Sequence, residues 1–84
     1  MALFNGQDLI SIISNALSLS QDDVDENSGT DNLVEWDSLG HLSVLSALDE
    51  KTNGKSSDIE GISELDSFKK LKVKLVSEGL MDES

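Results

Sequence analysis

A serine, an acid and a histidine stand close together in the stretch "EWDSLGHLSV", at Asp37, Ser38 and His41. In serine hydrolases a histidine accepts the proton of the nucleophilic serine, and a carboxylate orients that histidine. His41 is the only histidine, and its position three residues after Ser38 would put both on roughly the same helix face. The chain has, however, no G-x-S-x-G sequence and no predicted strand that would present an exposed nucleophile. We therefore predict no catalytic residue and no enzymatic activity.

Two acidic loops approach the calcium-binding pattern of the EF-hand. In "DEKTNGKSSDIE" (49–60), Lys51 stands at the third position of the pattern, where a ligand belongs. In the loop 23–35, Gly29 and Glu35 come one residue later than the glycine and the last glutamate of the pattern. Because only residues 36–48 separate the two loops, a pair of EF-hands would have to share one helix. We expect no metal site, and a small acidic calcium-binding helix-loop-helix module remains the alternative function. The residues of the 49–60 loop that do fit the pattern are Asp49, Asn53, Gly54 and Glu60.

The charge of the chain restricts its partners. Its 84 residues include 17 acids and six lysines, which leaves a formal net charge of -11. Such a chain repels nucleic acid and anionic membranes, so we expect protein partners with basic docking patches. The sequence has no cysteine, no apolar run of membrane-spanning length and no secretory signal at its start. We expect one domain, residues 1–84, that acts as a cytoplasmic monomer.

The first helical pattern begins after Asn5. Asn5 is a good N-cap with Asp8 at the third helical position, and Phe4 and Leu9 match a hydrophobic staple. The pattern stops at a polar, acidic loop, in which Val24 and Leu33 are the expected anchors to the core. The apolar stripe of this helix consists of Leu9, Ile12, Ile13, Ala16 and Leu17.

A second helix is expected to begin at Asp37 or Ser38. Leucines recur there at intervals of three, and Val44 widens the stripe that they form. His41 and Ser43 fall away from the stripe, so we expect His41 to face solvent. Gly54 breaks the pattern within "KTNGKSSD". The leucines of the predicted stripe are Leu39, Leu42, Leu45 and Leu48.

The C-terminal third predicts one short and one longer helix. We expect a helical turn over 58–62 and a last helix from about Ser67 to Glu78, capped by Asp66. Gly79 followed by Leu80 is typical of a glycine C-cap with a hydrophobic contact back to Leu75. The predicted fold is all-α: a small antiparallel bundle of three main helices plus one short helix, with a long loop between helices one and two. The inward residues of the last helix are expected to be Leu65, Phe68, Leu71 and Leu75.

The stretch "EWDSLGHLSVLSALDEKTNG" resembles the second-helix region of acyl carrier proteins and the related peptidyl carrier domains. The signature of that family is Asp-Ser-Leu, here Asp37, Ser38 and Leu39, followed by aliphatic residues along the helix and acids after it. The resemblance covers nearly the whole chain, because the helix with "LISIISNAL", the long loop and the closing helix with "ISELDSFKKLKVKL" come in the order of that family.

The resemblance implies that Ser38 carries a covalent 4'-phosphopantetheine, whose thiol holds an acyl or aminoacyl group as a thioester. A phosphodiester at a helix N-terminus would be stabilised by the positive end of the helix. Asp37 could orient the serine or cap the helix, and Leu39 completes the signature. An attachment point needs no base of its own, which agrees with a serine that lacks catalytic companions.

The resemblance also implies partners: a phosphopantetheinyl transferase and the enzymes that load and process the acyl or aminoacyl group. Of the acidic positions that such enzymes recognise, Asp37, Asp49 and Glu50 match. Bulky Trp36 before Asp37, and Gly40 and His41 in place of acids, depart from the fatty-acid-synthesis type. These departures favour a carrier for polyketide, nonribosomal peptide or related specialised synthesis. We expect Trp36 to be a hydrophobic anchor, with a wall for the arm or a partner contact as the alternative.

Overall fold

The computed structural model describes residues 4–82, and their regular structure is helical. Three α-helices follow one another along the chain: α1 (Gly6–Leu17), α2 (Ser38–Lys51) and α3 (Phe68–Ser77). Three 3-10 turns lie between them: η1 (Gln21–Asp23), η2 (Ser56–Asp58) and η3 (Ile62–Glu64). The described residues form no strand, only isolated bridges between Phe4 and Met81 and between Gly29 and Ser67. The prediction of an all-α chain is therefore confirmed.

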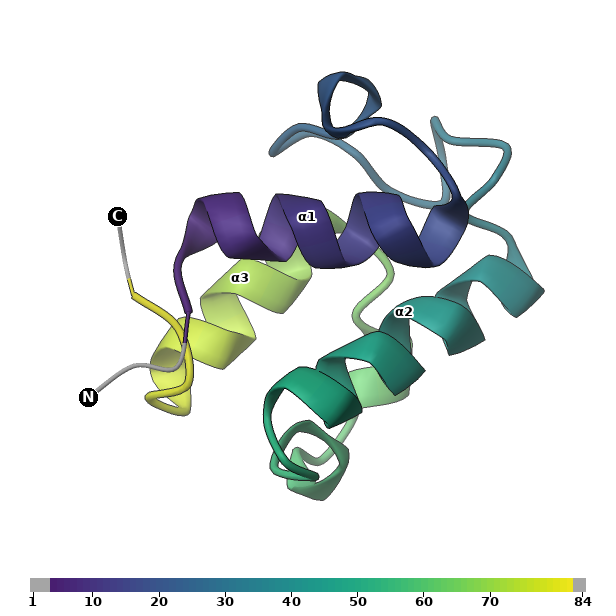
Figure 1. The fold of residues 1–84 in the computed structure, drawn as a ribbon. Coiled ribbons are helices and arrows are strands. Elements are labelled where there is room, and N and C mark those ends of the chain that lie inside the picture. Colours follow the sequence, from purple (N-terminus) through teal and green to yellow (C-terminus); the bar gives the residue numbers. More distant parts are fainter. Residues whose placement is uncertain (1–3, 83–84) are drawn as a thin grey trace.

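Helix α1 begins as its sequence predicts. The Asp8 N–H donates to Oδ1 of Asn5 (3.0 Å), and the Asn5 N–H donates to Oδ2 of Asp8 (3.1 Å), which completes a capping box. Leu9, Ile13 and Leu17 are buried on one face of α1 and belong to the core that α2 and α3 share. Figure 1 shows α1 running past both of these helices. Helix α1 therefore supplies the central apolar face of the fold.

The core is built by all three helices and by single anchors from the connections between them. Val24 of the first connection is buried, as expected, and Leu33 is partly buried against the core. At the ends of the described chain, the Asp82 N–H donates to the Phe4 carbonyl (2.9 Å), which places the two ends side by side (Figure 1). The buried apolar residues are Phe4, Leu9, Ile13, Leu17, Val24, Trp36, Val44, Leu48, Ile59, Phe68, Leu71, Leu75, Leu80 and Met81.

The predicted apolar stripe of α2 is confirmed at Val44 and Leu48 and is wrong at Leu39 and Leu42. Leu39 and Leu42 are 75% and 62% exposed, whereas Val44 and Leu48 are buried. An α-helix turns by about 100° per residue, so each interval of three falls about 60° short of a full turn, and Leu39 and Leu48 lie on opposite sides. The spacing of four between Val44 and Leu48 identifies the inward face instead.

Two predictions in the C-terminal third also need correction. The expected turn over 58–62 is divided into η2 and η3, because Gly61 has a positive φ (78°) and separates the two turns. The cap of α3 is Ser67 and not Asp66: the Lys70 N–H donates to Oγ of Ser67 (3.3 Å). The Asp66 carboxylate instead pairs with the Lys70 ammonium group at 3.0 Å.

The end of α3 agrees with the prediction. Gly79 has a φ of 77°, its N–H donates to the Val76 carbonyl (3.0 Å), and the Leu80 N–H donates to the Leu75 carbonyl (3.0 Å). These two bonds form a Schellman motif, and Leu80 is buried. None of the helices within residues 4–82 has both the length and the apolar character needed to cross a membrane.

Candidate functional site

Ser38 is the first residue of α2, and its side chain is exposed. Asp37 is the N-cap: its Oδ1 accepts a hydrogen bond from the Gly40 N–H (2.8 Å). The capping role considered for Asp37 is therefore the one that the structure shows. Hydrogen bonds in this region involve the side chains of Trp36, Asp37 and His41, and none within residues 4–82 involves the Ser38 hydroxyl.

Trp36 lies immediately before this helix start and is fully buried, as the anchor interpretation predicts. Its Nε1–H donates to Nδ1 of His41 (3.0 Å). Because an indole N–H can only donate, Nδ1 of His41 is unprotonated, and Nε2–H donates to the Ser63 carbonyl (2.9 Å). Two hydrogen bonds in series thus connect Trp36, which precedes the N-cap of α2, to His41 in the first turn of α2 and to Ser63 in η3.

The expectation that His41 faces solvent is wrong, because its ring is partly buried between Trp36 and η3. Both ring nitrogens are engaged, so neither is free to accept a proton from Ser38. The serine, acid and histidine that stand together in the sequence are near one another in space without the hydrogen bonds of a catalytic triad.

Gly40 is a site residue that the sequence reasoning missed. A Cβ at this position would overlap the Glu35 carbonyl oxygen and lie 2.8 Å from Cδ2 of Leu17. The first turn of α2 therefore approaches both the preceding loop and the end of α1 more closely than a side chain would permit. A glycine within the first turn of a predicted helix is the signal that could have indicated this contact.

A shallow hollow of about 410 Å³ opens beside Ser38. It lies between the start of α2 and the residues before α3. A hydrogen bond from the Lys70 ammonium group lowers the pKa of the Asp66 carboxyl, which is at the edge of this hollow. Most of the residues that line the hollow have polar side chains; they are Thr30, Trp36, Asp37, Ser38, His41, Ser63 and Asp66.

Exposed aliphatic side chains surround the same helix start. Leu39 and Leu42 project from α2, and Val34, in the loop before it, is 90% exposed. Leu39 and Leu42 are three residues apart and therefore lie on the same side of α2, where they form a small exposed apolar patch. Leu39, predicted from the Asp-Ser-Leu pattern, is therefore placed next to Ser38 on the surface.

Of the predicted partner-recognition acids, only Asp37 is beside Ser38. Asp49 and Glu50 are in the last turn of α2, which the helix rise puts about 17 Å away. Glu50 is exposed, whereas Asp49 is half-buried and its Oδ1 has no hydrogen-bond partner within residues 4–82. Glu50 is thus the better placed of the two for contact with a partner.

The acidic loop between α1 and α2 uses its polar side chains to hold turns. Oδ1 of Asp25 accepts from the Asn27 N–H (2.8 Å), and Oδ1 of Asn32 accepts from the Gly29 N–H (3.0 Å). Nowhere in residues 4–82 do three or more carboxylate or histidine side chains converge as metal ligands would. The calcium-binding alternative gains no support from this arrangement.

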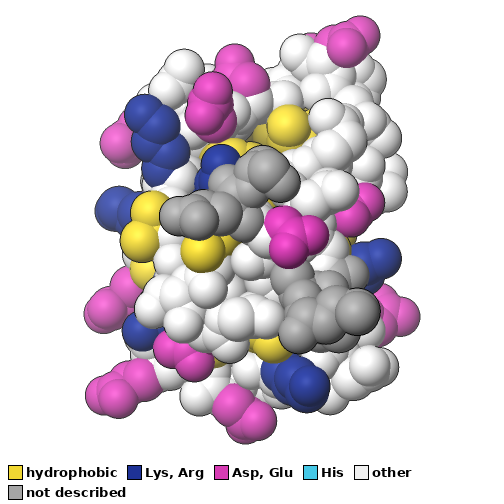
Figure 2. All heavy atoms as spheres, turned by 90° about the vertical axis from the view of Figure 1, so that its left-hand side faces the viewer, with side chains coloured by type: hydrophobic (Ala, Val, Ile, Leu, Met, Phe, Trp, Pro, Cys, Tyr) yellow, Lys and Arg dark blue, Asp and Glu magenta, His cyan; other side chains and the backbone are white. Residues whose placement is uncertain are grey.

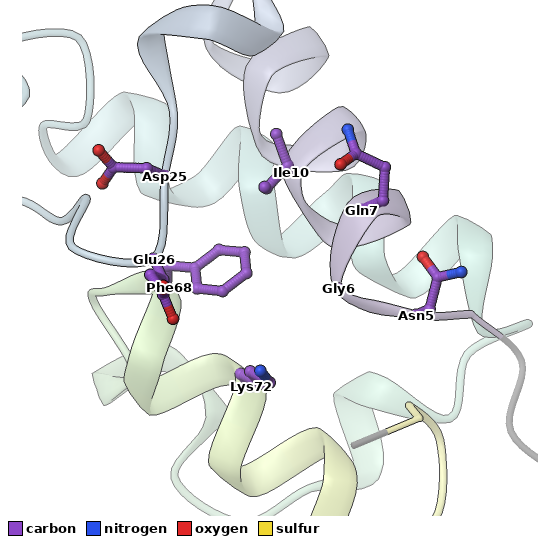
Figure 3. A pocket seen from close by; sticks show the side chains of 8 residues that line it. All are labelled: Asn5, Gly6, Gln7, Ile10, Asp25, Glu26, Phe68 and Lys72. Atoms are coloured by element: carbon purple, nitrogen blue, oxygen red, sulfur yellow. The ribbon is translucent and has the colours of Figure 1, made fainter. Parts of the chain in front are cut away.

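A larger hollow lies away from Ser38, between the start of α1, the 25–26 segment and α3. It measures about 470 Å³. Figure 3 shows the Phe68 ring pointing toward Ile10 at its apolar end, with Asn5 and Asp25 on opposite sides. Its charged lining residues are Asp25, Glu26 and Lys72, and within residues 4–82 Lys72 forms no ion pair with either acid. Lys72 at the rim connects this hollow to the surface of α3.

No known family model, curated protein sequence or solved structure matches the chain. The function is therefore inferred from the residues of this chain and from the resemblance of its second-helix segment to carrier proteins.

Proposed function

We propose that the chain is a carrier protein that holds acyl or aminoacyl intermediates as thioesters on a 4'-phosphopantetheine arm attached to Ser38. The observation that carries the proposal is the state of the Ser38 hydroxyl: it is exposed at the start of α2, unbonded within residues 4–82, and without a free base beside it. Such a hydroxyl is accessible to a modifying enzyme and unsuited to catalysis on its own.

The attachment reaction requires nothing from this chain except the hydroxyl. A transferase would bring the base that removes the Ser38 proton, and the serine oxygen would attack the phosphorus of coenzyme A that bears the pantetheine. The new P–O bond makes a phosphodiester between Ser38 and pantetheine. The bond between the attacked phosphorus and the oxygen that bridges to the second phosphorus breaks, which releases adenosine 3',5'-bisphosphate. The terminal thiol then supplies the sulfur that a chain without cysteine lacks.

The first turn of α2 can stabilise the product. Asp37 caps the Gly40 N–H, which leaves the N–H groups of Ser38 and Leu39 at the open end of the helix. A phosphodiester on Ser38 would carry its negative charge at this positive helix end. The neighbouring hollow offers polar groups to the arm, and the exposed Leu39 and Leu42 offer apolar contacts to the enzymes that process the cargo.

The proposal includes the finer points of the resemblance. The three helices would form an antiparallel bundle, and the carrier would act as a cytoplasmic monomer in fatty-acid, polyketide or related specialised synthesis. Trp36 and Gly40 favour the specialised types. Position 40 cannot hold the acidic residue that carriers of the fatty-acid-synthesis type have there, because any side chain would overlap the Glu35 carbonyl.

The test is incubation with coenzyme A and a broad-specificity phosphopantetheinyl transferase, followed by intact-protein mass spectrometry. We expect the addition of one phosphopantetheine, mapped to Ser38 by peptide fragmentation. Ser38→Ala should abolish the addition and keep the helical circular-dichroism signal, because alanine is favourable at the first helical position. Ser43→Ala, an exposed serine of the same helix, is the matched control and should be modified like the wild type.

Modification at another serine, or none with a transferase that modifies a known carrier in parallel, would contradict the proposal. The recognition acids can be tested in the same assay. Glu50→Lys should slow the modification at low ionic strength, and added salt should narrow the difference from wild type. Asp49→Lys is a weaker test because Asp49 is half-buried.

A further inference from the structure

The outer side of α3 differs in charge from the rest of the chain. Four of the six lysines are in this one helix, although the whole chain carries a net charge of -11. Val73, in the middle of these lysines, is 71% exposed. An aliphatic side chain held in solvent among cations is not explained by the packing of the core. The four lysines are Lys69, Lys70, Lys72 and Lys74.

Two hollows follow the outer side of α3 and share Lys69 and Val73. One, of about 430 Å³, is almost entirely apolar between its lysines and includes Leu65 and Ser77. The other, of about 330 Å³, includes Val76 and Glu26. Lys72 and Glu26 also line the hollow in Figure 3, so the three depressions form one continuous surface. We call it the α3 surface and define it by Leu65, Lys69, Lys72, Val73 and Val76.

The lysines of α3 are not equally available. Lys70 pairs with Asp66 (3.0 Å), and Lys74 lies 3.6 Å from the Glu78 carboxylate. Within residues 4–82, Lys69 and Lys72 form no ion pair. Lys69, Val73 and Val76 follow at i, i+4 and i+7, which places a cation and two aliphatic groups in one row along the helix. The α3 surface therefore offers two lysines without an ion-pair partner within residues 4–82, beside apolar area and with Glu26 at its edge.

From these features we infer that the α3 surface docks an acidic amphipathic helix of another protein, with carboxylates opposite Lys69 and Lys72 and aliphatic side chains against Val73 and Val76. A helix presents both kinds of group in one row, at the same spacing as α3 itself. Figure 2 shows one side of the molecule, on which lysine and hydrophobic side chains lie next to one another and acidic side chains lie around them. The inference does not depend on the modification of Ser38.

Charge complementarity separates this partner from the other classes. A second copy docked through the same surface would place lysines against lysines, because a two-fold interface repeats the same residues on both sides. Nucleic acid and anionic membranes also offer negative charge, but they would bring the remaining acids of this chain close to a polyanion. A short acidic helix contacts the α3 surface alone.

The experiment is a titration of the ¹⁵N-labelled protein, followed by amide chemical shifts. The probe is an acetylated peptide of about 18 residues, a length at which an isolated helix is populated. Its Glu residues form one row at i, i+4 spacing, and its Leu residues form a neighbouring row. We expect shift changes in residues 65–77 and about tenfold weaker binding of the peptide in which Lys replaces each Glu. The changes should be absent around Ser38.

The matched variants have equal changes in net charge. Lys69→Glu with Lys72→Glu should weaken binding about tenfold, whereas Lys51→Glu with Lys55→Glu, the two lysines outside α3, should change it less than about twofold. Val73→Ser should weaken binding about threefold by the loss of apolar contact. Glu26→Gln should strengthen it about twofold, because it removes an acid that lines the same hollow as Lys69 and Lys72.

Several results would overturn the inference. They are the absence of shift changes in α3, equal binding of the acidic and the lysine peptides, and equal losses in the two double variants. Binding of α3 to phosphatidylglycerol vesicles in preference to the peptide would assign the surface to a membrane. A dimer in sedimentation velocity that dissociates in the Lys69→Glu, Lys72→Glu variant would assign it to a second copy. Failure of Ser38 modification would leave the inference unaffected.

Discussion

The start of α2 and the outer side of α3 are both exposed, yet they are built differently. Behind Ser38 lie a buried indole, a hydrogen-bonded histidine and a glycine at a close contact, which connect α2 to η3 and to the end of α1. Behind Val73 lies only the helix itself, whose inner face packs through Leu71 and Leu75. The first region positions one hydroxyl, and the second displays a row of side chains.

This difference determines what substitutions do. In the region before and within the first turn of α2, a change in one side chain alters the position of the helix start, so stability and function are affected together. On the α3 surface, Lys69 and Val73 are exposed, whereas Leu65 and Val76 pack partly against the core. A change at Lys69 or Val73 should therefore affect binding and leave the fold almost intact. The α2 start thus depends on contacts between distant segments, whereas the row of Lys69, Val73 and Val76 on α3 is set by helix formation.

The largest expected effect is at Trp36. Trp36→Ala should lower the free energy of unfolding by about 3–5 kcal/mol, because it removes a fully buried indole and leaves a cavity. Val73→Ala should change it by less than about 0.5 kcal/mol, because Val73 is mostly exposed. Urea denaturation of both variants measures the contrast. Equal losses would show that α3 contributes more to the tertiary packing than its exposed face indicates.

Gly40→Ala is expected to have the next largest effect on the free energy of unfolding, and the direction of the change is informative. Within an ordinary helix, Gly→Ala stabilises by about 0.5–1 kcal/mol. Gly40→Ala should instead destabilise by about 2 kcal/mol, because the new methyl group would overlap the Glu35 carbonyl. Ser43→Ala, on the exposed side of the same helix, serves as the control and should be neutral in thermal unfolding. A stabilised Gly40→Ala variant would mean that α2 can move away from the preceding loop.

A smaller effect is expected from the hydrogen bond between Trp36 and His41. His41→Ala leaves a buried indole N–H without an acceptor and should cost about 1–2 kcal/mol. In a Trp36→Phe background the donor is absent, so the same substitution should cost clearly less. A double-mutant cycle by urea denaturation isolates the interaction between the two side chains. Additive losses would rule out a stabilising role for this hydrogen bond.

The smallest expected effect on stability comes from the ion pair of Asp66 with Lys70. Asp66 lines the hollow beside Ser38, and Lys70 belongs to α3. The hydrogen bond from Lys70 lowers the Asp66 pKa, so its stabilisation is present above the unfolded-state pKa of about 3.9 and is lost as pH falls through the lower, folded value. Lys70→Met should return the pKa toward its ordinary value and cost below about 0.5 kcal/mol at neutral pH, since the pair is exposed.

The measurement for Asp66 is a carboxyl ¹³C titration, supported by urea denaturation at neutral and at acidic pH. Lys72→Met is the control, because Lys72 forms no ion pair within residues 4–82. It should leave the Asp66 titration unchanged. A Lys72 effect as large as that of Lys70 would indicate a general response to charge in α3 and not a specific pair.

Local signals in the sequence predicted the helices well. Asn5 with Asp8, Asp37 before Ser38, and Gly79 with Leu80 each predicted a helix end that the structure contains. Asp66 was a wrong choice of cap because the adjacent Ser67 bonds the Lys70 N–H, and two neighbouring polar residues compete equally in sequence. The turn over 58–62 was misplaced because Gly61 adopts a left-handed conformation.

The candidate site was predicted only in part. Ser38, Asp37 and Leu39 were identified from one tripeptide, and the buried Trp36 from its size. The roles of Gly40 and His41 could not be predicted, because they depend on the Glu35 carbonyl, the end of α1 and the Ser63 carbonyl. The burial of Val44 in place of Leu39 and Leu42 likewise depends on which side of α2 the other helices occupy.

The sequence by itself determined where α1 and α2 begin, where α3 ends, which serine opens α2, and that α3 concentrates the lysines. These features arise from groups within a few residues of one another, whose geometry the helical backbone sets. Only the tertiary structure decided which leucines of α2 stay exposed, that His41 bridges Trp36 to η3, and that hollows join along α3. Those features require contacts between residues distant in the chain, and leucines, glycine and histidine satisfy many such arrangements until packing selects one.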